Sequence, residues 1–449
     1  MAIHDFISTA EKSSWLEDYA VFSSKIPASE PSALAQMRHS AIGRFEEIGF
    51  PKTSREEWRF TDIAPIARTG FRRVGSAESV ISPVQMVQYS YVTCGELVFI
   101  NGHYSPTFSS LCELPEGAVM GNLADALRTH PEKVQAHLGR YASFEENAFV
   151  ALNTAFLGDG AFIFIPRGSA IREPIHLLYL STGNAEPTVS YPRNLVIAEE
   201  GSEATIIESY AGTGGGGYLT CPVTEIVAGE GSAMRHYKLQ YESPDAFHVA
   251  AQQLYLAGGS SIASHSMSFG GGLVRNDLGA VLNGEGADCT LNGLYLVKGR
   301  QLVDNHLTVE HARPACSSRE LYKGILEEQS RAVFNGRIHV HPDAQQTDAE
   351  QTNHNLILSD KALVNSNPQL EIFADDVKCT HGSTTGQLDE DALFYLRSRG
   401  IGEGAARSLL IYAFASDCIE QVEFKPVRKD LRELLIDRLP QSDIVRQAV

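Results

Sequence analysis

The chain has 449 residues, a formal net charge of −18 and an isoelectric point near 5.3. Nucleic acids and anionic membranes require a basic surface on a protein that binds them. Because this chain is strongly acidic, neither is expected as a partner. No apolar run approaches the roughly 20 residues of a membrane-spanning helix, and the N-terminus lacks the basic start and apolar run of a secretory signal. These features predict a soluble, cytoplasmic protein.

The cysteines are scattered and odd in number. No Cys-x-x-Cys pair occurs, so the sequence predicts neither a disulfide framework nor a zinc ribbon, and it favours a reducing compartment. The seven positions are 94, 112, 221, 289, 316, 379 and 418.

Residues 1–90 are predicted to form an N-terminal helical region. The clearest helix is Ser32–Ile48, which has apolar residues at 3–4-residue spacing, Pro31 at its start and Gly49 just after its end. Residues 91–150 mix short apolar runs with a helix-like stretch around Asn122–Leu138, so they are treated as a transition.

From 151 to 386 the pattern changes to short β-branched and apolar runs separated by small residues. The turns recur roughly every 30 residues, which indicates a repeating structural unit. Such a repeat predicts a mainly β fold with a parallel β-helix or β-solenoid core, although an antiparallel sandwich has a similar spacing of strands and turns. The turns lie near Gly168, Gly201, Gly231, Gly259, Gly286, Pro314 and Pro342.

Helical patterning returns in residues 387–449, the predicted C-terminal helical domain. Helices are expected over Asp389–Arg399, Glu403–Cys418 and Lys429–Leu439. Because the ends of a solenoid need to be covered, capping is the simplest role for both helical regions.

Nucleotide-binding motifs are weak or missing. The run Gly212–Gly217 fits the string G-x-G-x-x-G, but the residues after it resemble a strand and not a helix that could bind a pyrophosphate. No G-x-x-x-x-G-K-[ST] string occurs, so ATP chemistry would belong to a partner.

Enzyme motifs are also weak. No close pair of carboxylates and no Ser/His/Asp grouping can be identified from the spacing, so a non-enzymatic role is expected. Metal binding is conceivable at His339 and His341, which share one face of a strand, but a hydrogen-bonded role is the more common one for a single histidine. The histidines of the later repeats are at 306, 311, 339, 341 and 354.

The most informative pair is Cys379 and His381, which lie two residues apart on an expected strand. Side chains at i and i+2 share a face, with Cα atoms about 6–7 Å apart, so one metal could contact both. Iron–sulfur clusters and closed zinc sites take four protein ligands, so other residues must complete the site. A second chain is a natural source. For Cys379 alone, a buried apolar role is the alternative.

Four segments together resemble the SufB/SufD family of the SUF system of iron–sulfur cluster assembly, and within it the SufD branch. The last of them leads into Val377-Lys378-Cys379-Thr380-His381-Gly382. The resemblance covers nearly the whole length. The segments are Ser54–Asp62, Ser318–Leu326, Phe334–Ile338 and Pro368–Ile372.

The resemblance implies a right-handed parallel β-helix that acts as a scaffold. It implies pairing with a SufB-like subunit through the C-terminal part of the β-helix, and binding of a SufC-like ABC-type ATPase by the C-terminal helical domain. His381, with Cys379 beside it, would hold a transient iron–sulfur cluster shared with the partner subunit. A homodimer is a further expectation for the chain alone. A reduced flavin is associated with the family, but no residue here supports one.

The chain departs from the family pattern at Thr380, Ser383 and Thr385, where Ser, Ala and Val are typical. These changes leave both metal ligands in place. A rival interpretation is a carbohydrate-active β-helix enzyme such as a lyase, but the missing signal peptide, the helical ends and the odd thiol count speak against it.

Overall fold

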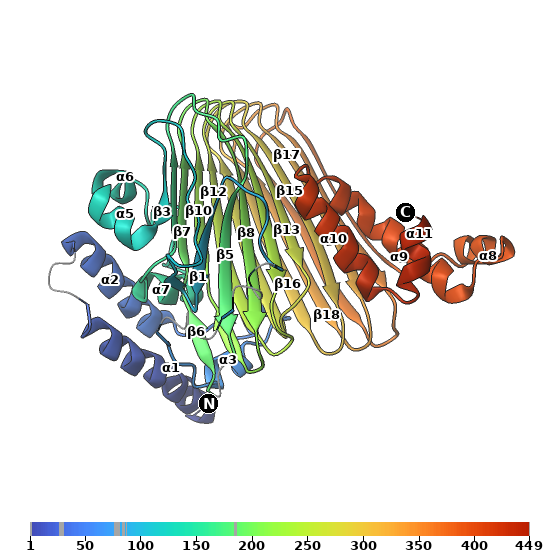
Figure 1. Ribbon diagram of the computed structural model, residues 1–449, viewed down its shortest axis with the longest axis horizontal. Helices are drawn as coiled ribbons and strands as arrows, with labels where there is room; N and C mark the ends of the chain where they lie inside the picture. The colour runs from blue at the N-terminus through green and yellow to red at the C-terminus, as the bar shows by residue number, and fades with distance from the viewer. Residues whose placement is uncertain are drawn as a thin grey trace.

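The structure is a computed structural model that describes residues 2–26, 31–75, 81–82, 86, 88–183 and 186–448. Its core is a parallel β-solenoid, in which the chain alternates between two sheets and each coil stacks on the one before (Figure 1). The mainly β fold and the parallel solenoid that the repeat predicts are therefore confirmed, and the antiparallel sandwich is excluded.

The first sheet has ten strands, and its order follows the coils from the N-terminal end to the C-terminal end. Apart from β2, which is antiparallel to β1, the strands pair in parallel. In order they are β2 (His103–Tyr104), β1 (Gly95–Ile100), β5 (Ile175–Thr182), β8 (Glu203–Thr213), β11 (Ala233–Tyr241), β13 (Ser261–Ser268), β15 (Asp288–Val297), β17 (Ser317–Leu326), β19 (Asp348–Ile357) and β21 (Lys378–Gly386).

The second sheet runs alongside the first. It begins with β3, which is antiparallel to β4. From β4 onward the strands pair in parallel, and β20 is the last of them. Its strands are β3 (Val119–Asn122), β4 (Ala161–Ile165), β7 (Arg193–Ala198), β10 (Val223–Ala228), β12 (Phe247–Leu256), β14 (Leu273–Leu282), β16 (Leu302–His311), β18 (Arg331–Val340) and β20 (Leu363–Ile372), with β6 (Thr188–Ser190) and β9 (Tyr218–Thr220) beside the path.

Glycines at one corner allow successive coils to turn in the same way. Gly168, Gly201, Gly231, Gly259 and Gly286 all have φ between 60° and 71°, a left-handed conformation that favours glycine. These are the turns that gave the sequence its period. Inward-facing side chains then alternate with outward-facing ones, and the inward set forms the largest apolar cluster of the molecule.

The N-terminal helices cover the outer face of the second sheet. Trp15 and Phe45 join Phe149 and outward-facing strand residues such as Val249 in one buried cluster. The helices are α1 (Ala2–Ser23), α2 (Ser32–Ile48), the 3₁₀ turn η1 (Glu56–Trp58), α3 (Ala64–Arg68), α5 (Leu123–Thr129), α6 (Pro131–Gln135) and α7 (Ala148–Ala155).

The C-terminal helices lie against the outer face of the first sheet (Figure 1). Leu431 and Ala415 share a buried cluster with outward-facing residues such as Leu239 and Ile325. The expectation that the helical regions cap the ends is therefore wrong, because their apolar faces cover the sides of the solenoid. The helices are α8 (Glu390–Ser398), α9 (Glu403–Glu420), α10 (Lys425–Arg438) and α11 (Ser442–Ala448).

The two ends of the solenoid differ. At the first coil the edges are covered by the short antiparallel strands β2 and β3. At the last coil β20 and β21 each have a strand on one side only, so that a row of backbone groups is left unpaired. Among the described helices, none is long and apolar enough to cross a membrane.

Candidate functional site

The predicted ligand pair lies on β21, the open edge of the first sheet. Cys379 is in register with Ala349 of β19, and His381 with Gln351, and both of these neighbours are buried inside the solenoid. Because register partners share a face, Cys379 and His381 both point to the inner side of the last coil. Cys379 is half-buried and His381 is exposed, so the pair stands at the mouth of the solenoid interior.

The Cys379 thiol packs against the interior apolar cluster. Burial is the largest cause that raises its pKa, and a hydrogen bond from the Ala349 backbone partly opposes the rise. The thiol is therefore mostly protonated at neutral pH. A metal that binds there must displace the proton, which makes binding stronger as the pH rises.

Behind His381 lies a pair of buried polar side chains. The Gln351 amide nitrogen donates to the Glu320 carboxyl at 2.8 Å, and each of these two side chains retains one oxygen without a partner. Desolvation raises the pKa of Glu320 to about 8, so this carboxyl is largely neutral at pH 7. Gly336 makes room for the pair, since a Cβ atom there would lie 2.4 Å from the Gln351 nitrogen.

Two ligands do not make a complete metal site. Across the described residues, no group of three or more His, Cys, Asp and Glu side chains is arranged to hold a metal ion. Completion of the site by ligands from elsewhere stays a prediction.

The other histidines that sequence analysis singled out are paired individually. His339 contacts Glu371 at 2.8 Å and His341 contacts Glu310 at 2.6 Å, on the exposed outer face of the second sheet. Their rings lie 4.9 Å apart. Metal binding by this pair therefore stays a hypothesis.

The three remaining histidines also have polar partners. His306 is 3.0 Å from Asp304, the buried His311 is 2.9 Å from Ser318, and His354 is 2.6 Å from Thr384. Desolvation lowers the pKa of His311 to about 4, so its ring is neutral at pH 7.

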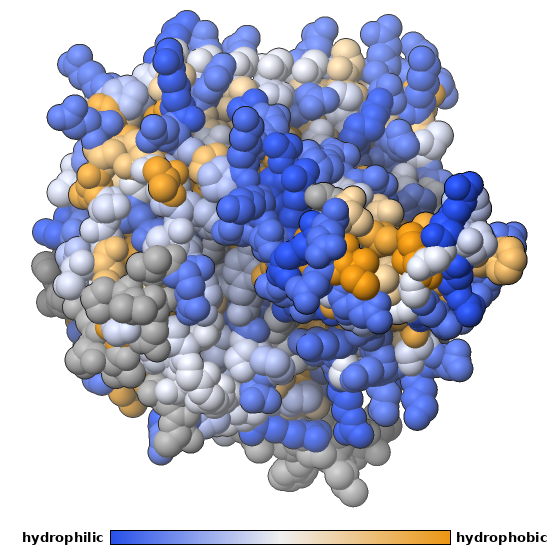
Figure 2. All heavy atoms as spheres, turned by 45° about the vertical axis from the view of Figure 1, so that its right-hand side comes forward, coloured by the Kyte–Doolittle hydropathy of each residue, from blue (hydrophilic) through white to orange (hydrophobic). Residues whose placement is uncertain are grey.

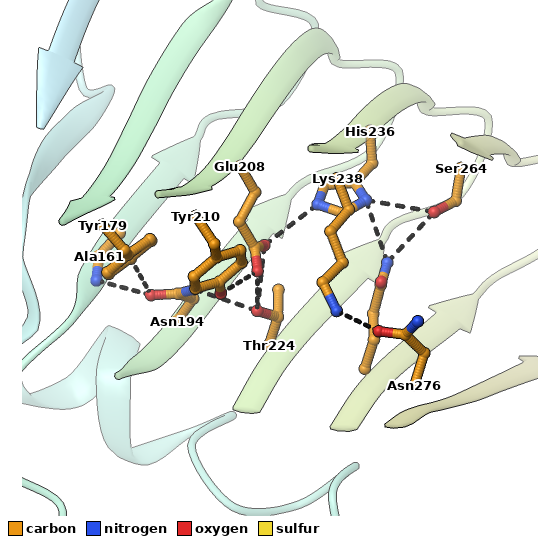
Figure 3. Close-up of polar contacts among 11 residues, drawn as sticks. Ala161, Tyr179, Asn194, Glu208, Tyr210, Thr224, His236, Lys238, Ser264 and Asn276 are labelled. Atoms are coloured by element: carbon orange, nitrogen blue, oxygen red, sulfur yellow. Dashed lines mark hydrogen bonds and ion pairs between the residues drawn. The ribbon is translucent and has the colours of Figure 1, made fainter. Parts of the chain in front are cut away.

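A buried polar network crosses the solenoid interior, which sequence analysis missed (Figure 3). Glu208 is its centre: it accepts from Tyr210 and Thr224 and lies 3.1 Å from His236. On the next coil Lys238 donates to Asn276 at 2.6 Å.

Two opposing effects act on this network. Burial disfavours the ionised forms, and lowers the pKa of Lys238 to about 8, while His236 and Tyr210 stabilise the Glu208 carboxylate and lower its pKa overall. Buried charges of this kind require a complete set of partners, so we interpret the network as a fixed internal element of the coils.

The cysteines correct one expectation. Cys94 and Cys112 form a disulfide between the start of β1 and the loop after β2, where the sequence predicted no disulfide framework. Spacing could not reveal this pair, because only the turn at β2 brings the two together. Burial raises the pKa of Cys221, Cys289 and Cys418, so these thiols are poor nucleophiles.

The segment 54–62 fastens the N-terminal region to the solenoid. The Arg275 guanidinium lies 3.7 Å from the Trp58 ring centroid, and it pairs with Asp304 at 2.7 Å. Thr61 donates to the same carboxylate at 2.5 Å. The glycine run 212–217 ends β8 and is followed by β9 and not by a helix, as expected for a run that is not a nucleotide-binding motif.

Helix α8 exposes two large aromatic side chains. Phe394 is 71% and Tyr395 is 56% exposed, while Phe373 after β20 is 61% exposed. Figure 2 shows a hydrophobic area on the side of the molecule that carries the C-terminal helices. Exposed apolar areas of this kind mark surfaces for other proteins.

Two family models match the chain. The model described as SUF system FeS cluster assembly, SufBD core domain, matches residues 179–414, and the model of the SufBD protein N-terminal region matches residues 9–177. The two matched regions meet within β5 and together extend from within α1, through the solenoid, to within α9.

Several curated proteins are similar over most of their length. An iron–sulfur cluster assembly SufBD family protein of Synechocystis sp. is 32% identical over 91% of this chain and 92% of its own. The iron–sulfur cluster assembly protein SufD of Escherichia coli is 32% identical over 87% of this chain and 90% of its own length. The protein of the same name from Bacillus subtilis is 24% identical over 90% of this chain and 93% of its own length. The chain belongs to the SufBD family of iron–sulfur cluster assembly proteins.

Proposed function

We propose that the chain is a non-enzymatic scaffold subunit, which presents Cys379 and His381 at a seam with a second β-helix subunit similar to SufB. The observation that carries this proposal is the position of the pair, inward-facing and partly open on the last strand β21, whose outer edge has no neighbouring strand. The nascent iron–sulfur cluster is the cargo, and the partner subunit supplies the remaining ligands. Family membership supports the assignment to cluster assembly.

The open edge supports pairing of two solenoids. Strand β21 leaves its outer row of backbone groups unpaired, and such an edge can accept a strand from another chain. Without the sister subunit, the same edge would allow two copies of this chain to form a homodimer.

The C-terminal helices are proposed to bind an ABC-type ATPase similar to SufC, through residues 388–420. The exposed rings of Phe394 and Tyr395 supply an apolar contact surface, and the buried face of α9 holds the helices to the solenoid. Dimerisation of two ATPase subunits on ATP would move these helices, strain the seam and open the ligand pair to iron or sulfur. No described residue supports a flavin site.

The test is the substitution His381→Ala. Because this side chain is exposed, the complex should still form, while the activity of cluster-dependent enzymes in cells should fall by about tenfold or more. His354→Ala is the matched control, since His354 lies one coil earlier on the outward face of the same sheet.

Both variants should be purified without oxygen from the native host and examined for a co-purifying ATPase and a second β-helix subunit. Normal enzyme activity in the His381→Ala strain would remove the site assignment. Recovery of the wild-type chain without either partner would contradict the scaffold proposal itself.

A further inference from the structure

A cavity of about 870 Å³ lies on the outer face of the second sheet. One wall is the segment after η1, with Arg59, Phe60 and Asp62. The other wall is formed by the first residues of five strands of the second sheet, β12, β14, β16, β18 and β20. It is separate from the Cys379 and His381 pair, which belongs to the inner side of the first sheet. Its volume is typical of sites for small molecules.

The charge of this cavity is opposite to that of the chain. Four cationic side chains line it, and the only acidic group among its lining residues is Asp62, which already accepts from the Ala64 backbone at 2.9 Å. In a chain of formal charge −18, the cavity carries a formal charge of +3. Charge of one sign in a cleft concentrates the field and attracts anions. The cations are Arg59, Arg300, Arg331 and Lys361.

These four cations are exposed, and within the described ranges none of them forms an ion pair or donates a side-chain hydrogen bond to the protein. Arg275, the arginine that contacts Trp58, differs, because Asp277 and Asp304 neutralise it. The lining cations therefore have their hydrogen-bond donors available for a ligand.

The coil repeat brings three of the cations to the same corner of successive coils. Leu302, Arg331 and Leu363 are in register on successive coils, so Arg300 and Lys361 occupy equivalent positions two residues before β16 and β20. Neighbouring strands are about 4.8 Å apart, which puts these two Cα atoms about 10 Å from one another. Gln329 occupies the equivalent position between them, and Arg331 lies two residues after it, at the start of β18. This spacing suits a ligand with more than one phosphate group.

The segment 54–62 gives independent support. Trp58 and Thr61 are buried and hold the segment on Arg275 and Asp304, so these two residues have a structural role. Arg59 and Phe60 are exposed over the cavity, with Phe60 at 45%, and the fastening does not need them. On the opposite wall Leu363 is 50% exposed.

We propose that this cavity binds a small phosphate-bearing ligand, with Arg59, Arg300, Arg331 and Lys361 on its phosphates and Phe60 and Leu363 on its apolar part. Guanidinium groups present a planar fork of donors that matches phosphate oxygens. The proposal goes beyond the scaffold function and does not depend on it.

The test uses inorganic pyrophosphate as the probe, in calorimetric titrations of the full chain at low and at physiological salt. We expect saturable binding of one pyrophosphate per chain, weakened by salt because the contacts are ionic. Arg331→Glu should weaken it by about tenfold or more, since a charged hydrogen bond is lost and a repulsive charge is added. Lys361→Gln provides a second, milder variant.

Arg172→Glu is the matched control. Arg172 is an exposed arginine outside the cavity, and its substitution changes the net charge by the same amount as Arg331→Glu. It should bind pyrophosphate as the wild type does. An equal loss in the control, the absence of saturable binding, or binding of an acidic peptide such as oligoglutamate in preference to pyrophosphate would overturn the proposal. Thermal unfolding of each variant verifies that the fold is retained.

Discussion

At the residue scale, the sequence predicted that Cys379 and His381 share one face of a strand, because alternation along a strand has a fixed period of two, but not that this face is the inner one. It did not reveal that Glu320 is buried. On β17 the inward positions include Glu320, while the outward Leu321 lies beneath the C-terminal helices. Apolar residues occur on both faces of β17, with Tyr322 and Leu326 inside and Ile325 outside, so alternation alone does not assign the faces of this strand.

Glu320 makes stability depend on pH. Its pKa is raised by burial from 4.5 to about 8 in the folded chain, so folding costs nothing extra below pH 4.5 and progressively more as the pH rises toward 8. The cost is about 3 kcal/mol at pH 7. Glu320→Gln removes the ionisation and supplies an amide for the unpartnered Gln351 oxygen.

We expect Glu320→Gln to raise the free energy of unfolding at pH 7.5 and to change it little at pH 5. Urea unfolding at the two pH values measures this. The exposed Glu350 of β19 is the control, and Glu350→Gln should leave the pH dependence of the wild type unchanged. An equal pH dependence in Glu320→Gln and the wild type would contradict the assignment of a raised pKa to this carboxyl.

At the element scale, helices could be predicted to within a few residues wherever end signals are strong. Ser32–Ile48 agrees with α2, because Pro31 and Gly49 mark both ends. The stretch Asn122–Leu138 instead forms two helices, because Pro131 starts the second one. Helix α10 begins at Lys425, four residues before the expected start, with Pro426 in its first turn.

The position of the C-terminal helices could not be predicted, since it depends on outward-facing residues of coils far away in the sequence. Leu431 on α10 is fully buried in that contact. Leu431→Ala should therefore destabilise the packing of α9 and α10 by about 2–5 kcal/mol, through lost burial and a remaining cavity.

Hydrogen exchange measures this effect locally. Amides of α9 and α10 should exchange faster in Leu431→Ala, while those of β12 to β18 stay protected. Ile444→Ala on α11 serves as the control, because Ile444 is 46% exposed and should change little. Uniformly faster exchange throughout the solenoid would show that the helices and the coils unfold as one unit.

At the scale of the whole molecule, the solenoid is closed at its first coil and open at its last. Lys378 donates its backbone N–H to Thr347 of the preceding coil. Because N–H directions alternate along a strand, those of Thr380, Gly382 and Thr384 also face β19, and that of Thr385 faces the open edge. Period and turn residues predicted the coils, but which end is left open depends on the antiparallel strands β2 and β3, which the sequence did not identify.

This alternation yields two proline variants with opposite consequences. Thr385→Pro removes an N–H that faces away from β19, so the last coil should stay intact while the edge loses a donor for an incoming strand. Thr384→Pro removes an N–H that faces β19 and should loosen the last coil itself. We expect Thr385→Pro to unfold at the wild-type temperature yet to lose most of its pairing with a second β-helix subunit, measured by co-purification and by light scattering of the chain alone. Pairing that survives in Thr385→Pro would mean that the subunits meet through side chains and not by extension of the sheet at β21.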